Sequence, residues 1–318
     1  MEVLSHSKPF PVDQPLVSVI TPCLNAARFI ERTIDSVLAQ DYPHVEYIVM
    51  DGGSTDETVA ILERYGARVR YFSSPDQGAS DAINRGFLES RGSIFAWLNA
   101  DDVYLPGAIT AAVRCLRSVP EAVVAYGEGV WIDESGYELG AYPTVSPYDP
   151  AALERDCCLC QPAAFIRRES FERVGMLDSA LESAFDYDLW IRLSRDGLFV
   201  ATSDLLAGSR MHRDNKSLGR RRQVFEESML VLRRRIGYVP AHWVYGYLSF
   251  LRDGRDQYFE PLRHSAPAYL ATLAVGSYYN YQRLWRFWRE WMSLLTVRNI
   301  QRVYAEGQKT RPVYGSRR

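Results

Sequence analysis

The stretch Ile94-Phe-Ala-Trp-Leu-Asn99-Ala-Asp-Asp102 decides the fold. Residues 94–98 are apolar and aromatic, and so short a run predicts a buried strand. A buried strand that ends in two adjacent carboxylates, Asp101 and Asp102, sets them at the carboxyl edge of a sheet, where open α/β sheets bind ligands. Two like charges held close together are costly unless a cation or hydrogen-bond donors face them. The alternative interpretation is that either aspartate merely begins a turn before Pro106.

Strand and helix patterns alternate over the first hundred residues. Ser54 and Glu57 have the spacing of a capping box, which predicts a helix that begins there and runs to about Tyr65. This alternation predicts an α/β fold, with a mostly parallel sheet and right-handed crossover helices. We expect strands at 16–20, 47–50, 69–72 and 94–98, and helices at 28–39, 54–65 and 80–90.

Beyond residue 105 the alternation loosens. From about Arg233 the composition shifts to Tyr, Trp and Arg, and segments of helical length run to about Val303 before a polar, basic tail. Between these regions we expect a helix at 106–116, strands at 123–126 and 129–132, a turn at 133–136, a strand at 163–166 and a helix at 189–195.

The composition is that of an ordinary globular protein. Of 318 residues, 47% are apolar and 24% charged, and the net charge of −2 gives no argument for nucleic-acid binding. Five cysteines, an odd number without a disulfide framework, indicate a reducing compartment. The amino terminus has no signal-peptide pattern. Residues 265–282 carry no formal charge, but they are too polar to predict a membrane span.

Asp51 ends the second expected strand as the carboxylate pair ends a later one, so all three acids should meet at one edge of the sheet. Gly52 and Gly53 would let a ligand approach the backbone closely, although a simple turn explains them equally well. The first strand is followed by Thr21-Pro-Cys-Leu-Asn25, without the glycine fingerprint of a dinucleotide site. This counts against NAD and favours another nucleotide.

Three further polar residues stand out beyond the first hundred positions. Asp186 precedes the expected helix and is free to project into a cleft as a proton acceptor. Asp188 is placed to cap that helix, and capping is the favoured interpretation. His212 follows an expected strand, and a structural role and a functional one are equally supported. Asn84, taken alone, is more typical of a surface or capping position.

Together these residues resemble the family 2 glycosyltransferases, inverting enzymes of the nucleotide-diphospho-sugar transferase superfamily that have the GT-A fold. The resemblance covers about residues 15–220, and it rests on the order and spacing of motifs that are each weak alone. These motifs are Val19-Ile-Thr21-Pro22-x-x-Asn25, Asp51-Gly-Gly-Ser54-x-Asp56-x-Thr58, Ala82-x-Asn84-x-Gly86, Asn99-Ala-Asp101-Asp102-x-x-x-Pro106 and Asp186-Tyr-Asp188-Leu-Trp190-x-Arg192-Leu193.

The family implies transfer of a sugar from a nucleotide diphosphate donor, here a UDP-sugar, to an acceptor hydroxyl with inversion at the anomeric carbon. By this resemblance Asp186 is the catalytic base. Asp102, Asp101 and His212 would bind the metal, with Asp102 as the first choice. The residues that would contact the donor are Thr21, Pro22, Asn25, Asp51, Asn84, Asn99 and Asp101.

The resemblance also divides the chain. It implies a lead-in at 1–14, a GT-A domain at 15–235 with a nucleotide-sugar half (15–115) and an acceptor half (116–235), and a helical, aromatic and basic extension at 236–318. Two positions depart from the family pattern. Asn99 stands where many members have an acid, and Phe185 stands where a glutamate often precedes the base. The second departure leaves the acceptor side less defined.

The chemistry is consistent with these roles. Negative charge develops on the leaving diphosphate, and Mg²⁺ or Mn²⁺ held by carboxylates would stabilise it. An oxygen-rich site suits these ions, whereas zinc favours His and Cys ligands. The acceptor hydroxyl has a pKa far above 7, so it needs a base within hydrogen-bonding reach.

The carboxy-terminal region interleaves cations with aromatic residues. Residues 283–318 hold nine basic and two acidic side chains, which fits a helix on a membrane surface. A helix packed on the catalytic domain, or a partner interface, is slightly favoured over that interpretation.

We therefore expect a cytoplasmic enzyme of glycan or surface-polysaccharide assembly, with any membrane contact at the inner face and no nucleic-acid partner. Its acceptor would be a glycan or a lipid-linked one. The alternatives are a transferase that acts on a lipid-phosphate acceptor, and a GT-A-like protein that binds nucleotide or glycan without turnover.

Overall fold

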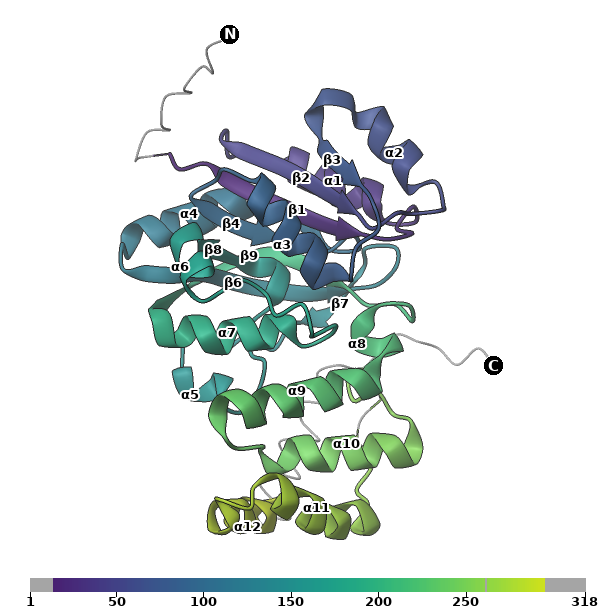
Figure 1. Cartoon of the computed structure of the whole chain (residues 1–318), viewed down its shortest axis with the longest axis vertical. Coiled ribbons are helices and arrows are strands. Elements are labelled where there is room, and N and C mark those ends of the chain that lie inside the picture. Colours follow the sequence, from purple (N-terminus) through teal and green to yellow (C-terminus); the bar gives the residue numbers. More distant parts are fainter. Residues whose placement is uncertain (1–13, 261, 295–318) are drawn as a thin grey trace.

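The computed structural model describes residues 14–260 and 262–294. In this part of the chain a single sheet has the strand order β3-β2-β1-β4-β8-β6-β9-β5, with β7 beside β6 (Figure 1). The strands are β1 (Val17–Cys23), β2 (Val45–Asp51), β3 (Arg70–Ser73), β4 (Ile94–Trp97), β5 (Val103–Tyr104), β6 (Ala122–Ile132), β7 (Glu138–Ala141), β8 (Ala164–Arg167) and β9 (Leu198–Arg210).

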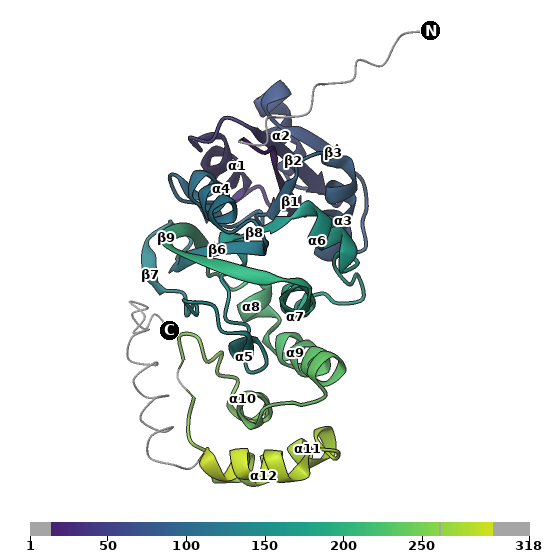
Figure 2. The ribbon, with the colours of Figure 1, turned by 90° about the vertical axis from the view of Figure 1, so that its left-hand side faces the viewer.

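Helices surround the sheet and continue below it as a stack. In Figures 1 and 2, α7, α9 and α10 follow one another away from the sheet, and α11 and α12 form the outermost layer. The α-helices are α1 (Ile30–Leu38), α2 (Thr58–Tyr65), α3 (Ala79–Glu89), α4 (Ala108–Ser118), α5 (Pro150–Leu153), α6 (Arg168–Arg173), α7 (Phe185–Asp196), α8 (Lys216–Gly219), α9 (Arg221–Ile236), α10 (Ala241–Asp253), α11 (Ala266–Tyr279) and α12 (Leu284–Ser293); η1 (Gly66–Arg68) and η2 (Gln161–Ala163) are short 3₁₀ turns.

The first four strands run parallel, as the alternating pattern predicts. β1 lies between β2 and β4, and all seven of its residues are buried. The register pairs Cys23 with Asp51 and Ile20 with Trp97, so β1, β2 and β4 end at the same edge of the sheet. The predicted α/β fold is confirmed, but the sheet is mixed: β8 is antiparallel to both β4 and β6, β7 to β6 and β5 to β9.

The two strands predicted at 123–126 and 129–132 are wrong as separate elements, because β6 runs through both. Gly127 marks a close approach between β6 and β9 and not a turn. A Cβ atom at this position would lie 2.5 Å from the Leu206 side chain and 2.7 Å from the carbonyl oxygen of Asp204. Glycine is required there because no side chain fits between the two strands.

Two predicted helix starts are also wrong. Helix α2 begins at Thr58, and the side chain of its N-cap residue, Glu57, makes no capping hydrogen bond; the Asp56 carboxylate accepts a hydrogen bond from the Thr58 backbone N–H at 3.0 Å. Ser54 instead donates a hydrogen bond from its hydroxyl to Asp51. Helix α7 begins at Phe185, so Asp186 lies in its first turn and not ahead of the helix.

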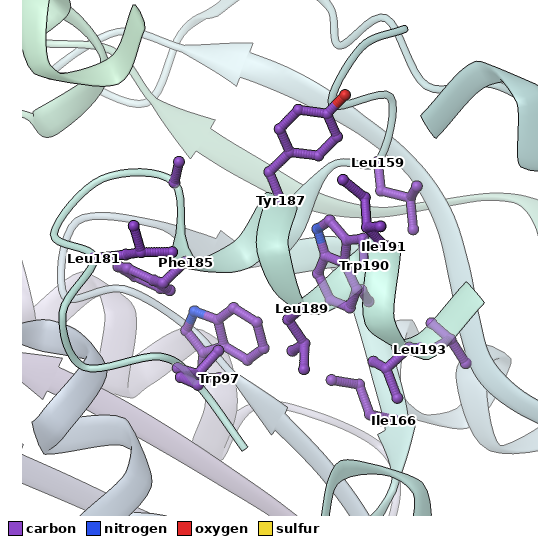
Figure 3. Close-up of a cluster of buried hydrophobic side chains, with 14 of the residues drawn as sticks. Trp97, Leu159, Ile166, Leu181, Phe185, Tyr187, Leu189, Trp190, Ile191 and Leu193 are labelled. Atoms are coloured by element: carbon purple, nitrogen blue, oxygen red, sulfur yellow. The ribbon is translucent and has the colours of Figure 1, made fainter. Parts of the chain in front are cut away.

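A stacked aromatic cluster joins the sheet to α7. The rings of Trp97 in β4 and Trp190 in α7 lie 5.6 Å apart and nearly parallel, and Phe185 lies 6.4 Å from Trp97 (Figure 3). Trp97 and Trp190 are fully buried. Because stacked aromatic pairs add stabilisation beyond the burial of their area, this cluster fixes the first turn of α7 next to the end of β4.

The helical region after residue 235 contains no segment that could cross a membrane, as far as the described residues extend. The helical segments predicted between Arg233 and Val303 are α10, α11 and α12, and positions after 294 lie outside the described residues.

Candidate active site

Asp51 lies at the end of β2 inside a ring of hydrogen-bond donors. Its carboxylate accepts hydrogen bonds from the Ser73 hydroxyl at 2.6 Å, from the backbone of Ser54 at 3.1 Å and from the backbone of Gly53 at 3.2 Å. The Ser54 hydroxyl donates to it as well. Burial alone would raise the pKa of Asp51, but these hydrogen bonds outweigh burial and hold the pKa below its usual value. Asp51 is therefore a fixed negative charge at this edge.

The loop after β1 is joined to the Asp51 loop. Asn25 has a left-handed backbone with a φ of 51°, and its side-chain oxygen accepts a hydrogen bond from the backbone of Thr55 at 2.8 Å. Thr21 and Pro22 lie within β1 and are buried, and the hydroxyls of Thr21 and Tyr47 lie 3.0 Å apart. The structure thus places Thr21 and Pro22 in the strand next to β2, and it bonds Asn25 to the loop that follows Asp51; a contact with a donor remains a prediction.

The carboxylate pair after β4 lies in a turn in which the backbone of Asp102 donates to the carbonyl of Asn99 at 3.1 Å. Asp102 is buried, and its carboxylate accepts hydrogen bonds from the Asn99 side chain at 3.0 Å and from the backbone of Arg210 at 2.8 Å. Burial and the neighbouring Asp101 raise the pKa of Asp102 above its usual value. Because of these two hydrogen bonds, both carboxylate oxygens of Asp102 already have partners within the protein.

Asp101 points a different way from Asp102. Its carboxylate lies 2.9 Å from Nε2 of His212, which follows β9, and its side chain is 25% exposed. The guanidinium of Arg210 donates to the Asp101 carbonyl at 2.7 Å and lies over the Phe29 ring. Two segments more than a hundred residues apart thus meet at this carboxylate.

We tested whether these residues suit a divalent cation. Nε2 of His212 faces the Asp101 carboxylate, and Nδ1 of the same ring is buried without a hydrogen-bond partner. Among the described residues no cluster of three or more His, Cys, Asp or Glu forms a complete metal cage. Mg²⁺ is usually bound by one or two carboxylates together with substrate phosphates, so this donor set fits such an ion once a diphosphate is bound.

Asp186 lies in the first turn of α7, with its carboxylate accepting a hydrogen bond from the backbone of Tyr187 at 2.7 Å. Burial raises the pKa of Asp186 to about 6, and hydrogen bonds and the cation of Lys216 lower it only in part. A general base is most effective when its pKa lies near the working pH. The raised pKa therefore matches the predicted role, and the role itself remains a prediction.

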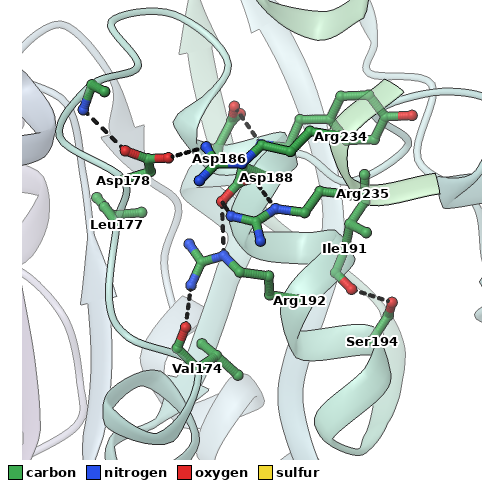
Figure 4. A network of polar contacts seen from close by, with 12 residues as sticks. Val174, Leu177, Asp178, Asp186, Asp188, Ile191, Arg192, Ser194, Arg234 and Arg235 are labelled. Atoms are coloured by element: carbon green, nitrogen blue, oxygen red, sulfur yellow. Dashed lines mark hydrogen bonds and ion pairs between the residues drawn. The ribbon is translucent and has the colours of Figure 1, made fainter. Parts of the chain in front are cut away.

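The capping role favoured for Asp188 is wrong. Asp188 is fully buried and pairs with two arginines, Arg192 at 2.7 Å and Arg235 at 2.6 Å (Figure 4). Arg192 belongs to α7, whereas Arg235 belongs to α9, and Arg192 also donates to the Val174 carbonyl at 2.6 Å. Asp188 thus joins two helices through a buried ion-pair network.

The hydrogen bonds of Asn84 connect it to Leu177 and not to the other predicted donor contacts. Its amide nitrogen donates to the Leu177 carbonyl at 2.9 Å, and its amide oxygen accepts from the Leu177 backbone at 3.1 Å. These two bonds connect α3 to the segment that precedes α7. A donor contact by Asn84 stays a prediction, but its amide is occupied in this structure.

Two further residues at this edge were not among the predicted site residues. Gln161 accepts a hydrogen bond from Asn99 at 3.1 Å and donates to the Trp97 carbonyl at 2.8 Å. Thr33 donates from one hydroxyl to the carbonyls of Ala100 and Asp102. Both residues are far from the carboxylates along the chain, so no local pattern connects them to the site.

The fold and this edge define a class of protein. A mixed α/β sheet has a fixed acid at the end of β2, a carboxylate–histidine pair after β4 and β9, and a carboxylate with a raised pKa on a neighbouring helix. This arrangement is that of a nucleotide-sugar transferase of the GT-A type.

Comparison with known sequences agrees with this class. Residues 18–175 match the family model described as Glycosyl transferase family 2. An uncharacterized glycosyltransferase of Rickettsia felis is 32% identical over 229 residues, which is 68% of this chain and 37% of that protein. Chondroitin synthase of Escherichia coli is 26% identical over 64% of this chain and 30% of its own length. The chain thus spans only about a third of the length of each of these relatives.

Solved structures share the GT-A fold. A crystal structure of S. aureus TarS in complex with UDP-GlcNAc aligns with a TM-score of 0.58 at 15% identity, over 85% of this chain and 82% of that one. The mannosyltransferase PcManGT from Pyrobaculum calidifontis, in complex with GDP-Man and Mn²⁺, aligns with a TM-score of 0.56 at 18% identity, over 95% and 90%.

The chain belongs to glycosyl transferase family 2, a family of transferase enzymes.

Proposed function

We propose that this chain transfers a sugar from a nucleotide diphosphate sugar to an acceptor hydroxyl, with inversion and with help from Mn²⁺ or Mg²⁺. One observation carries the proposal: the edge of the sheet holds a carboxylate–histidine pair, Asp101 with His212, while a separate carboxylate with a raised pKa, Asp186, lies on α7. These are the two groups that the reaction needs, one toward the leaving diphosphate and one toward the acceptor.

A UDP-sugar is the proposed donor. Asp51 and the loop held by Asn25 present a fixed negative charge and backbone groups at the end of β1 and β2, where a nucleoside would lie. TarS in complex with UDP-GlcNAc supports the choice of nucleotide, and PcManGT in complex with GDP-Man and Mn²⁺ supports the choice of metal. Both proteins share the fold with this chain.

In the proposed mechanism Asp186 takes the proton of the acceptor hydroxyl as that oxygen attacks the anomeric carbon. At pH 7 most Asp186 is ionised, because its pKa of about 6 lies below that value. Asp101 and His212 would hold the divalent cation, which neutralises charge on the departing diphosphate. Asp102 keeps the turn in place through Arg210 and Asn99 and is more suited to positioning than to binding the ion.

The proposed acceptor is a glycan, as in assembly of a surface polysaccharide. Chondroitin synthase and an O-antigen biosynthesis protein of Myxococcus xanthus, RfbC, are among the relatives that share this domain, which supports a polysaccharide product. A lipid-linked acceptor remains the second choice for the same site.

Donor turnover by the full chain tests the proposal. Release of nucleotide diphosphate is measured with Mn²⁺ and with EDTA, for wild type, Asp186→Asn and the control Glu169→Gln, whose side chain is exposed on α6. We expect EDTA to abolish turnover and Asp186→Asn to lower kcat by about 10²–10⁴-fold, the usual contribution of a general base. Equal, slow release by wild type and Asp186→Asn with every acceptor would show a binding protein without turnover.

We further propose that the protein works in the cytoplasm with its outermost helices against an anionic membrane surface. The exposed side of α11 and α12 supports this: Leu270, Tyr278, Trp285 and Met292 are each more than half exposed. Arg289 adds positive charge on the exposed part of α12, while Glu290 turns inward to accept a hydrogen bond from the backbone of Ala241. Tryptophan, tyrosine and arginine favour the headgroup layer.

A further inference from the structure

A glutamate on α9 binds the backbone that leads into α7. The carboxylate of Glu227 accepts hydrogen bonds from three successive backbone N–H groups, those of Glu182 at 3.1 Å, Ser183 at 2.7 Å and Ala184 at 3.0 Å. Gln223, one turn earlier in α9, donates to the same carboxylate at 2.8 Å. The sequence around α7 gives no sign of this contact, because Glu227 lies more than forty residues later.

These N–H groups lie at the entry to α7: those of Glu182 and Ser183 precede the helix, and the third belongs to Ala184, its N-cap residue. The first N–H groups of a helix have no acceptor within the helix, and the helix dipole favours negative charge there. Ala184 is the N-cap residue, just before α7 begins at Phe185, and its own side chain cannot cap the helix. Glu227 therefore provides, from another helix, the acceptor that the local sequence lacks, and Asp186 follows two residues after Ala184.

The same stretch of backbone, which we call the 177–184 segment, is bound from both sides. On the α3 side, Asn84 makes its two hydrogen bonds with Leu177, and Ser80 donates to the Leu181 carbonyl at 3.2 Å. On the α8 and α9 side, Lys216 donates to the Glu182 carbonyl at 2.7 Å.

Ion pairs add to this second side of the 177–184 segment. Arg220 pairs with Glu182 at 2.7 Å, and Arg234 of α9 pairs with Asp178 at 2.8 Å (Figure 4). The 177–184 segment therefore spans from the nucleotide half of the domain to the helical stack, with Glu227 making the largest set of charge-assisted bonds.

We propose that Glu227 is a positioning residue for Asp186: by fixing the backbone of residues 182–184, it sets where the base meets the acceptor. The inference rests on the proposed function of Asp186. A catalytic carboxylate must lie within about 0.5 Å of its productive position, and a misplacement of about 1 Å costs about 10²-fold in rate. Glu227 contacts neither donor nor acceptor in this scheme. Replacing it should therefore lower kcat and leave the binding of the donor unchanged.

The test compares three full-length variants: Glu227→Ala, the conservative Glu227→Gln, and Glu226→Gln as a matched control. Glu226 is the next residue in α9, but it bonds Arg222 and Tyr247 and not the 177–184 segment. We expect Glu227→Ala to lower kcat by about 10–100-fold with the donor KM changed less than about twofold. Glu227→Gln keeps an acceptor oxygen and should recover part of kcat, and Glu226→Gln should match wild type.

Two further readouts separate positioning from a general loss of stability. Amide hydrogen exchange at residues 182–184 should be faster in Glu227→Ala, whether or not a substrate is present. The acid limb of the kcat–pH profile should move to lower pH in Glu227→Gln, because the Glu227 charge raises the pKa of Asp186. Lys216, Cys157 and Tyr142 also lie near Asp186 and stay unchanged in this comparison.

The outcomes distinguish this inference from the proposed function. If wild type turns over a donor and Glu227→Ala has the same kcat, or if exchange at residues 182–184 is unchanged, Glu227 does not position the base. If wild type turns over no donor, the proposed function fails, and the exchange experiment still decides whether Glu227 fixes this backbone.

Discussion

The raised pKa of Asp186 predicts how kcat depends on pH. Burial raises this pKa to about 6, and a general base works only when it is deprotonated. Below about pH 6 the protonated form dominates, so kcat should fall about tenfold per pH unit there; above it, kcat should reach a plateau. The measurement is kcat between about pH 5 and 8 at saturating donor and acceptor, with circular dichroism as a check of folding. A rate that stays flat to about pH 5 would contradict the assignment.

The proposed metal site at Asp101 and His212 predicts which aspartate controls the Mn²⁺ concentration needed for activity. Asp101 is the partly exposed member of the carboxylate pair, whereas both oxygens of Asp102 are engaged. Asp101→Asn should therefore raise the Mn²⁺ concentration for half-maximal activity by about 10–100-fold, in line with losses of ligand-shell contacts elsewhere. Asp204→Asn, on β9 but bonded to Arg114, is the control. Calorimetric titration with Mn²⁺ in the presence of nucleotide diphosphate gives a readout independent of turnover.

For single residues, the sequence predicts that the carboxylates Asp101 and Asp102 lie together at the end of a strand, but not the direction in which each side chain points. That Asp101 and Asp102 follow a buried strand could be seen in residues 94–102, and the structure confirms it. The different directions of the two side chains could not be predicted from this stretch. They depend on the backbone of Arg210, which bonds Asp102, and on His212, which contacts Asp101, and both lie at or after the end of β9. The contact between Asn84 and Leu177 was equally invisible, since ninety-three positions separate the two residues.

At the scale of elements, Asp188 fixes α7 against α9. Its carboxylate is fully buried and is shared by Arg192 and Arg235. Removing one partner of a buried pair leaves charge uncompensated and typically costs about 3–5 kcal/mol. We therefore expect Asp188→Ala to lower the free energy of unfolding by about that amount in urea titrations.

An ion pair on the surface serves as the control for the stability loss expected from Asp188→Ala. Arg64 and Glu31 lie 3.1 Å apart on α2 and α1, and both are more than half exposed. Arg64→Ala should change the free energy of unfolding by less than about 1 kcal/mol, as is usual for surface ion pairs. If the two variants lose similar stability, the Asp188 network does not hold the helices together.

Helices and strands were predictable where their signal is local. The apolar spacing of α1 and the short apolar run of β4 are sufficient to place both elements. The start of α7 was not predictable, since its capping carboxylate, Glu227, comes from α9. β6 was divided wrongly at residues 127–128; in the structure Gly127 makes room for β9, and the strand continues through this point.

For the whole molecule, the layers connect the site to its outermost helices. Asp186 lies in α7, α7 packs on α9, and α10 separates α9 from α11 and α12 (Figure 2). α11 and α12 lie farthest from the sheet in this stack (Figure 1), and they carry the exposed residues Leu270, Tyr278, Trp285 and Met292. A membrane beneath α11 and α12 would thus leave the edge of the sheet free for donor and acceptor.

Vesicle flotation of the full chain tests this orientation. We expect binding to vesicles that contain phosphatidylglycerol but little binding to pure phosphatidylcholine, and release at high salt, because salt screens the arginine–lipid attraction. Trp285→Ser with Met292→Ser should abolish most of the binding without unfolding the protein, because both side chains are more than half exposed. Leu88→Ser, an exposed apolar residue on α3, is the matched control. Equal flotation of the double variant and wild type would show that this face does not bind lipid.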